Sequence, residues 1–265
     1  MQTLPPDRVV VRARSLAKRG NQDAARDLLI DAAKRFPQNK KLRKALVLLD
    51  MPKVGPRPGG LDEKVKHLGI LCRQGEHRAA IKLASQLLEL HPGDPIVMTL
   101  LAAAYVASEK PAEALPIFEL VIRQAPTFAR AWTGFGTALA KTNRHHQAVR
   151  ALNQSLSLSP LDVEALNNLG TSLRELNQHE EALSCFERII ELEDSYKARL
   201  NLGTTLLELG RAEESEAALR LAIAEKPDYT FAHRCLTLVR KYTADDPHLA
   251  QMEALNNAPD ATRET

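Results

Sequence analysis

The sequence predicts an all-α protein built from repeated units. Pro92, Pro126 and Pro160 fall 34 residues apart; Asp194 takes the next such position, and Pro227 follows 33 residues later. Apolar residues make up 44% of the 265 residues but aromatic residues only 4%, so that Ala and Leu supply most of the apolar mass, as closely stacked helices require. No segment shows the period-two alternation of a half-buried strand.

Other residue types recur in phase with these markers. Twelve residues before successive markers stand Ala114, Ala148 and Ala182, and eight residues before them stand Phe118, Leu152 and Phe186. Three units begin with a shared apolar pattern, in Met98–Tyr105, Trp132–Leu139 and Leu166–Leu173. This skeleton resembles the tetratricopeptide repeat, strongly over residues 61–242 and weakly over 6–50. The resemblance implies two antiparallel helices per unit, stacked into a right-handed superhelical solenoid, and a protein that binds partners.

The N-terminal part is expected to be a separate basic element, residues 1–50. Residues 7–37 resemble a degenerate helical pair broken at Gly20-Asn21, and residues 40–50 form one more amphipathic helix. The segment 51–60 contains three prolines and three glycines, which cannot continue a helix. We interpret it as a linker before the main array.

The main array is expected to consist of units 61–94, 95–128, 129–162, 163–195 and 196–229, followed by a capping helix at 230–242. Gly136, Gly170 and Gly203 share the eighth position of their units, where a small residue lets the first helix press against the second. Asp246-Pro247 has the pattern of a helix N-cap and first-turn proline. We therefore expect a short helix at 247–256 and a polar, disordered tail at 257–265.

The sequence carries no catalytic signature. It has no phosphate-binding G-x4-GK[ST] loop, no HExxH, no G-x-S-x-G and no EF-hand loop. Gly134-x-Gly136 lies inside an expected helix, and His145-His146 has no third metal ligand at a useful spacing. We expect a protein that is not an enzyme and that has no catalytic residue, cofactor or metal.

The sequence favours a cytoplasmic protein of bacterial type. The three cysteines, Cys72, Cys185 and Cys235, form no CxxC motif and no even framework, which indicates reduced thiols. Residues 1–14 contain no apolar signal region, and the longest mostly apolar run, 98–107, is too short to span a bilayer.

Charge is distributed unevenly along the chain. Residues 1–60 carry 14 Lys and Arg against 5 Asp and Glu, whereas the remainder carries 22 basic and 28 acidic residues. A basic start is compatible with an anionic partner such as nucleic acid or lipid, with docking on the acidic array, or with simple solvation. No aromatic residues interleave with these charges as single-strand binding requires, which argues against nucleic acid.

The resemblance places the binding surface on the concave face, which the first helices line. The family's geometry assigns to this face Asp62, Val65, Lys66, Arg73, Ile96, Thr99, Leu100 and Ala103 in the first two units. In the later units we expect a groove that binds an extended peptide through Arg130, Thr133, Thr137, Asn167, Asn168, Thr171, Lys197, Asn201 and Thr204.

Two amides in this set are similar to the asparagine ladder in the repeat arm of O-linked N-acetylglucosamine transferases. Asn168 and Asn201 share the sixth position of their units, and a carboxamide can pair with both polar groups of a peptide backbone. Only these two rungs match, because Gly134 and Leu100 take the earlier sixth positions. The alternative is that these amides are solvated groove residues. The carboxylate clamp that binds the tails of heat-shock chaperones matches at only two of five positions, Asn168 and Lys197.

The segment from Lys241 to Glu253 resembles the junction between repeats and catalytic domain in bacterial tetratricopeptide–sulfotransferase proteins, most closely at Asp245–His248. Its alternative is a generic capping helix. The favoured function is a protein–protein interaction scaffold that holds an extended polypeptide. The alternative is a substrate-recruiting arm of a sulfotransferase or O-linked glycosyltransferase whose catalytic part is absent or separate. The identity of the partner and the oligomeric state stay open.

Overall fold

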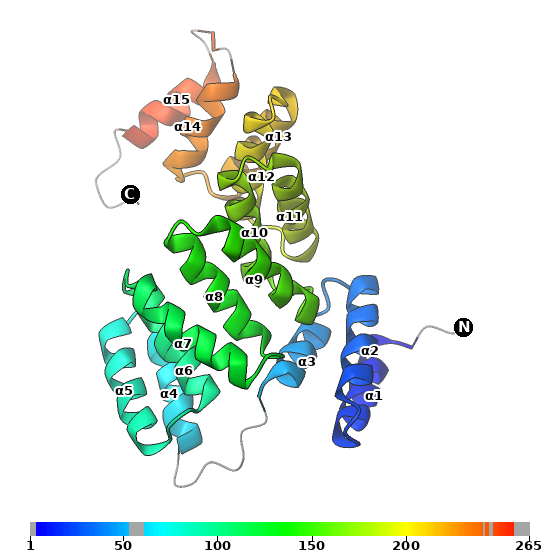
Figure 1. Ribbon diagram of the computed structural model, residues 1–265. Helices are drawn as coiled ribbons and strands as arrows, with labels where there is room; N and C mark the ends of the chain where they lie inside the picture. Colours follow the sequence, from blue (N-terminus) through cyan, green and yellow to red (C-terminus); the bar gives the residue numbers. More distant parts are fainter. Residues whose placement is uncertain (1–3, 53–60, 241, 244–245, 257–265) are drawn as a thin grey trace. The chain divides into compact units, whose positions relative to one another are not determined.

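The computed structural model of the chain describes residues 4–52, 61–240, 242–243 and 246–256 (Figure 1). Within these residues the fold is all-α. In chain order the helices are α1 (Pro6–Lys18), α2 (Gln22–Arg35), α3 (Lys40–Asp50), α4 (Leu61–Arg73), α5 (His77–Leu90), α6 (Pro95–Ala107), α7 (Pro111–Gln124), α8 (Ala129–Lys141), α9 (His145–Leu158), α10 (Val163–Glu175), α11 (His179–Leu192), α12 (Tyr196–Glu208), α13 (Ala212–Glu225), α14 (Thr230–Val239) and α15 (Pro247–Asn256).

The helices alternate as first and second members of a repeated pair. The first helices α4, α6, α8, α10 and α12 begin at residues 61, 95, 129, 163 and 196, where the sequence places the starts of the units. Within each compact unit, consecutive helices pack against one another, for example α6 with α7, α8 with α9 and α12 with α13. The predicted fold class, a solenoid of helix pairs, is confirmed.

One backbone conformation recurs at the turn inside each of these pairs. The second residue after the first helix is left-handed, with φ of 77° at Gly75, 58° at Glu109, 60° at Asn143, 58° at Asn177 and 73° at Gly210. Such a residue ends a helix and lets the following N–H groups bond back to the last carbonyls. The amide of Arg144, for instance, donates to the carbonyl of Leu139 at 2.9 Å. The turn is therefore set by the backbone and recurs with the repeat.

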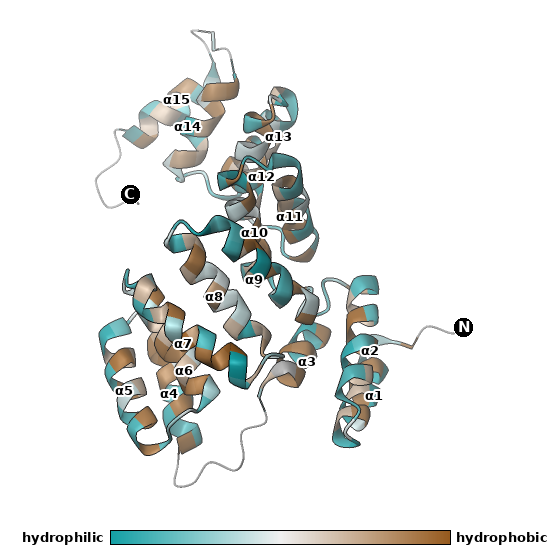
Figure 2. Cartoon of the chain, in the orientation of Figure 1, coloured by the Kyte–Doolittle hydropathy of each residue, from teal (hydrophilic) through white to brown (hydrophobic). Residues whose placement is uncertain are grey.

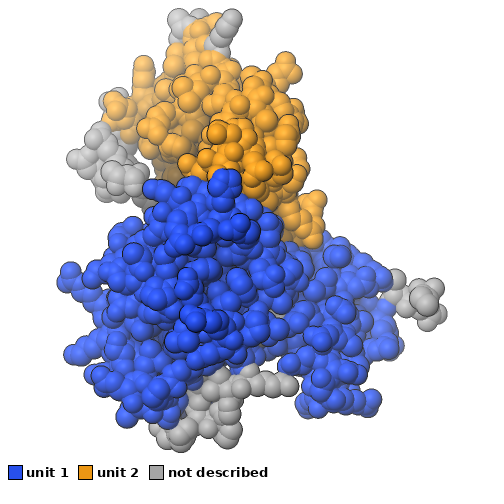
Figure 3. Space-filling view, viewed as in Figure 1, with its two compact units in different colours: residues 1–172 blue, residues 173–265 orange. Residues whose placement is uncertain are grey.

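The chain divides into two compact units, residues 1–172 and 173–265, which Figure 3 shows in blue and orange. The division falls within α10, in the middle of the array, and the expected linker at 51–60 does not separate the two compact units. Residues 53–60 of that linker and the expected tail at 257–265 lie outside the described residues.

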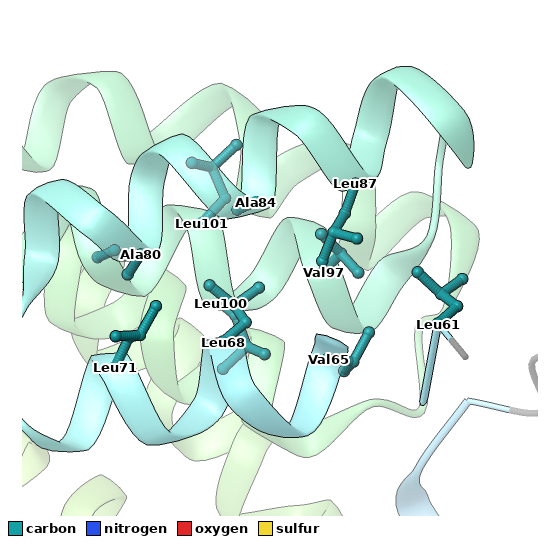
Figure 4. Packing of buried hydrophobic residues seen from close by; sticks show 11 residues of the cluster. Leu61, Val65, Leu68, Leu71, Ala80, Ala84, Leu87, Val97, Leu100 and Leu101 are labelled. Atoms are coloured by element: carbon teal, nitrogen blue, oxygen red, sulfur yellow. The ribbon is translucent and has the colours of Figure 1, made fainter. Parts of the chain in front are cut away.

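The core of the first unit consists of apolar clusters between first and second helices, and the cluster over α4, α5 and α6 is aliphatic. Figure 4 shows Leu68 of α4 and Leu100 of α6 pointing toward one another beneath Ala84 and Leu101. In this cluster, Leu68 is fully buried and Leu100 is 8% exposed. Figure 2 shows that the helices are apolar along one face and polar along the other, and α6 is the most uniformly apolar. This pattern is what a helix that is covered by two neighbours requires.

Glycines permit close helix contacts in this core. A Cβ atom at Gly136 would lie 2.5 Å from the Leu152 side chain, and a Cβ at Gly134 would lie 2.4 Å from the Phe118 ring. In the second unit, a Cβ at Gly203 would lie 2.8 Å from Leu219. The packing role predicted for the eighth position therefore holds at Gly136 and Gly203, where any side chain would force the helices apart.

The C-terminal part differs slightly from expectation. Helix α14 ends at Val239 and not at 242, because Arg240 takes an extended conformation. The backbone N–H of His248 donates to Asp246 Oδ1 at 3.0 Å, which makes Asp246 the N-cap of α15 as predicted. Across the described residues, none of the helices has the length and apolarity needed to span a membrane.

Candidate functional site

A groove of about 820 Å³ runs across the first helices of the first unit. Helices α4, α6 and α8 contact one another in turn and supply most of its walls. It is lined by Met51, Asp62, Val65, Lys66, Gly69, Ile70, Cys72, Arg73, His77, Ile96, Thr99, Leu100, Ala103, Ala104, Ala107, Phe128 and Arg130. Every concave-face position that the sequence assigns to the first two units is in this set.

The groove combines an apolar floor with exposed charged side chains, which are three cations and the carboxylate of Asp62. Small and aliphatic side chains such as Ile96, Leu100 and Ala103 form the floor. Lys66, Arg73 and Arg130 are exposed around it, and none of the three makes an ion pair with the part of the chain that the structure describes. The surface can therefore accept apolar side chains and negative charge together.

The half-buried Cys72 lies in the same groove. Burial raises the pKa of its thiol, and the nearby Arg130 and Arg73 partly oppose this rise. The thiol Sγ lies 3.9 Å from the carbonyl oxygen of Leu100 and is a weak donor to it. A protonated thiol held in this way is a poor nucleophile.

Of the predicted peptide-contact residues, Arg130 alone lies in this groove. Thr133 is 2% exposed, and the prediction that it faces a ligand is wrong. Its hydroxyl contacts Ser155 Oγ at 2.7 Å and donates to Asp162 Oδ2 at 2.8 Å. Because Asp162 Oδ1 accepts the first free N–H groups of α10, Thr133 serves the helix cap and is closed to solvent.

The next predicted residues form a short polar chain. Asn168 Nδ2 donates to Thr137 Oγ1 at 2.8 Å, and Thr137 Oγ1 donates to the carbonyl of Thr133 at 2.9 Å. Asn168 is half-buried. The oxygen and the second hydrogen of its side-chain amide make no hydrogen bond within the described ranges. Thr171 is exposed, and its hydroxyl donates to the carbonyl of Asn167 at 3.0 Å.

The second unit holds the remaining three residues, all on α12. Lys197 is exposed, with its Nζ 5.8 Å from the centroid of the Tyr196 ring. The carbonyl of Asn201 accepts the hydroxyls of Thr204 at 3.0 Å and Thr205 at 2.7 Å. Asn201 and Thr204 are half-buried.

Sequence reasoning missed an aromatic and basic cluster beside Lys197. The rings of Tyr196 and Tyr229 meet edge to face with centroids 5.4 Å apart, and Phe231 lies 6.4 Å from Tyr229. Lys226 Nζ lies over both tyrosine rings, at 5.3 and 5.5 Å. These contacts join the start of α12 to the start of α14. The sequence does contain a signal for this cluster, because aromatic residues stand at the starts of two successive first helices.

The described residues contain no group of three or more His, Cys, Asp or Glu side chains arranged to hold a metal ion. The groove and the polar chain of Asn168 and Thr137 are two arrangements that a partner could recognise. Both lie on first helices, which are held in place by the second helices behind them.

Comparison with solved structures shows the same fold. A thermophilic TPR protein from Thermus thermophilus is 18% identical to this chain, with a TM-score of 0.57. The match covers 67% of this chain and 97% of the Thermus chain. YrrB is 21% identical with a TM-score of 0.54, and the match covers 79% of this chain and 97% of YrrB. MamA is 18% identical with a TM-score of 0.54, and the match covers 62% of this chain and 96% of MamA. No curated protein matches the chain.

Family models described as tetratricopeptide repeat match residues 9–29, 71–140, 133–193 and 167–230, and the last three ranges overlap in turn. These matches cover helices α5 to α13, together with the last residues of α4 and parts of α1 and α2. Together with the 34-residue phase, the recurring left-handed turn and the shared fold, they place this chain in the tetratricopeptide repeat family.

Proposed function

We propose that the protein is an interaction scaffold that holds an extended polypeptide along its first helices. The observation that carries the proposal is the groove over α4, α6 and α8, with its apolar floor and its three exposed cations. Three packed first helices, with axes about 8–10 Å apart, present a surface about 20 Å across. An extended chain rises about 3.3 Å per residue, so the groove suits about six residues.

The groove chemistry defines the partner segment. Alternate residues of an extended chain point the same way, so aliphatic side chains can lie on Ile96 and Leu100 while acidic side chains reach the rim. Lys66, Arg73 and Arg130 would pair with these acids. Such pairs steer association and give specificity, and salt screens them. The preferred ligand is therefore an acidic peptide with aliphatic residues at every second position.

The amides further along the array would hold a peptide backbone. Asn168 retains one donor and one acceptor, the pair that a peptide unit needs. Arg130, Thr137, Asn167, Thr171, Lys197, Asn201 and Thr204 complete the proposed contact set. Among the relatives, YrrB is described as a TPR protein with an unusual peptide-binding site, which is consistent with peptide binding on this fold.

The test is binding of labelled octapeptides to the full chain, measured by fluorescence anisotropy. Peptides that alternate Glu with Leu should bind, whereas peptides that alternate Lys with Leu should not. The variant Lys66→Ser/Arg73→Ser/Arg130→Ser should lose at least tenfold in affinity. The matched control is Arg78→Ser, which removes an exposed cation from α5 outside the groove and should bind as the parent does. Equal binding of the acidic and basic peptides would overturn the proposal.

The second candidate is a substrate-recruiting arm for a sulfotransferase or an O-linked glycosyltransferase. It rests on the segment 241–253, which is similar to the repeat–enzyme junction, and on the Asn168 and Asn201 positions. Purification of partners on the immobilised chain would decide: recovery of a transferase that modifies the bound peptide supports this candidate. Recovery of the peptide-bearing partner without any transferase leaves the scaffold function.

A further inference from the structure

Two buried histidines join the last two helices of the second unit. His233 of α14 is 3% exposed and His248 of α15 is 8% exposed. Their rings stack with centroids 5.0 Å apart, and His233 Nδ1 lies 2.7 Å from His248 Nε2. Buried imidazoles in direct contact are sensitive to protonation, because a charged imidazole loses its hydration.

The protonation state of this pair follows from its neighbours. His233 Nε2 lies 2.8 Å from the carbonyl oxygen of Pro227, which can only accept, so this nitrogen carries the hydrogen. In the neutral ring, His233 Nδ1 must then accept from His248 Nε2. His248 Nδ1 must in turn accept from the hydroxyl of Tyr242, at 2.6 Å. With both rings neutral, these contacts form a hydrogen-bonded chain with one direction.

An added proton disturbs this chain. One proton on His248 Nδ1 requires Tyr242 to reverse its hydroxyl, and a proton on each ring would bring two N–H groups face to face at 2.7 Å. The docked arrangement thus holds at most one extra proton. When α15 separates from α14, the His248 imidazole returns to water and can bind a proton without this constraint.

The charged groups around the pair come from three elements. Arg220 and Glu216 of α13 are paired at 2.7 Å, and Arg240, which follows α14, lies 2.8 Å from Asp246 at the start of α15. Burial lowers the pKa of His248; His233, Arg240 and Arg220 lower it further, whereas Asp246 raises it. A cavity of about 440 Å³ borders both Asp246 and His248 and gives protons access.

We propose that α15 is an acid-released latch, held on α14 at neutral pH by the His233–His248–Tyr242 chain. The sign follows from linkage. Because burial in the docked state disfavours the charged form of His248, the latch is fully stable above the ordinary histidine pKa of about 6.5 and weakens as the pH falls below it. Release takes up about one proton at His248, so the opening equilibrium should rise about fivefold between pH 6.5 and 5.5 and approach about tenfold per pH unit below that range. Opening would expose Leu236 of α14, which lines the cavity.

The test uses the full chain in two measurements. Nitrogen-15 spectra of the histidine rings at pH 7.5 should show both rings neutral with the hydrogen on Nε2. Hydrogen exchange of residues 247–256, corrected for the intrinsic pH dependence, should accelerate about fivefold between pH 6.5 and 5.5. His248→Gln keeps a side-chain donor for His233 but cannot be protonated, and it should flatten the pH dependence. The control His146→Gln changes an exposed histidine on α9 and should leave it unchanged.

If His248→Gln releases α15 at every pH, the latch is still tested by the ring spectra and the hydrogen exchange of the unchanged protein. Ordinary titration of both rings with no change in exchange between pH 6.5 and 5.5 would overturn the latch. So would spectra that place the hydrogen of His248 on Nδ1 at neutral pH, because the chain would then have the opposite direction.

Discussion

Asn168 donates to Thr137 across two successive first helices, at 2.8 Å. The bond fixes the amide of Asn168 so that its remaining donor and acceptor have a defined orientation. An amide held in this way loses less side-chain entropy when it binds a ligand than a free one does. The polar positions of α8 and α10 are therefore ordered before a partner arrives.

The double variant Asn168→Ala/Asn201→Ala should weaken binding of an acidic peptide by about five- to a hundredfold, since each lost hydrogen bond contributes about 0.5–1.5 kcal/mol. The Asn168 change should also cost a similar amount of folding free energy, because the Thr137 contact is lost. Anisotropy titrations and urea unfolding measure the two effects. Unchanged affinity with intact helicity would remove the two amides from the binding site.

Gly136→Ala should destabilise the first unit by about 1–3 kcal/mol, because its methyl group would overlap the Leu152 side chain. The matched control is Gly69→Ala in α4, where a Cβ would lie at an ordinary 3.6 Å from Arg73. That change should stabilise the helix by about 0.5–1 kcal/mol. Thermal unfolding followed by circular dichroism compares the two, and equal melting temperatures would contradict the packing role of Gly136.

Gly210→Ala should destabilise the second unit by about 1–2 kcal/mol although nothing lies within 4 Å of the added methyl. The cost arises from the left-handed backbone, with φ of 73°, which Cβ disfavours. Gly210→Asn should cost less, since Asn143 and Asn177 already adopt this conformation at the same position of their units. The prediction fails if chemical denaturation shows that Gly210→Ala is more stable than Gly210→Asn.

Bound peptide should slow alkylation of Cys72 and leave Cys185 and Cys235 unaffected. Cys72 lines the groove, whereas burial raises the pKa of Cys185 to about 11 and also raises that of Cys235. Because the thiolate reacts and the pKa of Cys72 is raised, its alkylation should accelerate about tenfold per pH unit between pH 7 and 8.5. Mass spectrometry after iodoacetamide treatment measures each site. Equal slowing at all three thiols would indicate general stabilisation and not groove occupancy.

Much of the fold could be predicted from sequence because it repeats. The prolines at 34-residue spacing fix where first helices begin, and Gly136 marks a close contact that only a small residue permits. The concave positions of the first two units follow from the same phase, and they meet in one groove. Periodicity is informative here because every unit is covered by its neighbours in the same way.

Individual side-chain contacts do not repeat from unit to unit, and the sequence pattern does not predict them. Thr133 occupies a groove position by phase, but Asp162 and Ser155 draw its hydroxyl into the interior. The His233–His248 pair depends on how the loop after α14 returns α15 to its neighbour, and no spacing rule describes that return. The aromatic contacts of Tyr196 and Tyr229 are likewise specific to two units.

The ring of Phe118 has a consequence for how a ligand could be read along the array. It is fully buried and fills the space that any side chain at position 134 would need. An amide cannot be introduced at position 134 without displacing the ring. If the sixth-position amides hold a ligand backbone as we propose, the first of them in the array is therefore Asn168. Over the groove that precedes Asn168, recognition would then depend on the side chains of the ligand and not on its backbone.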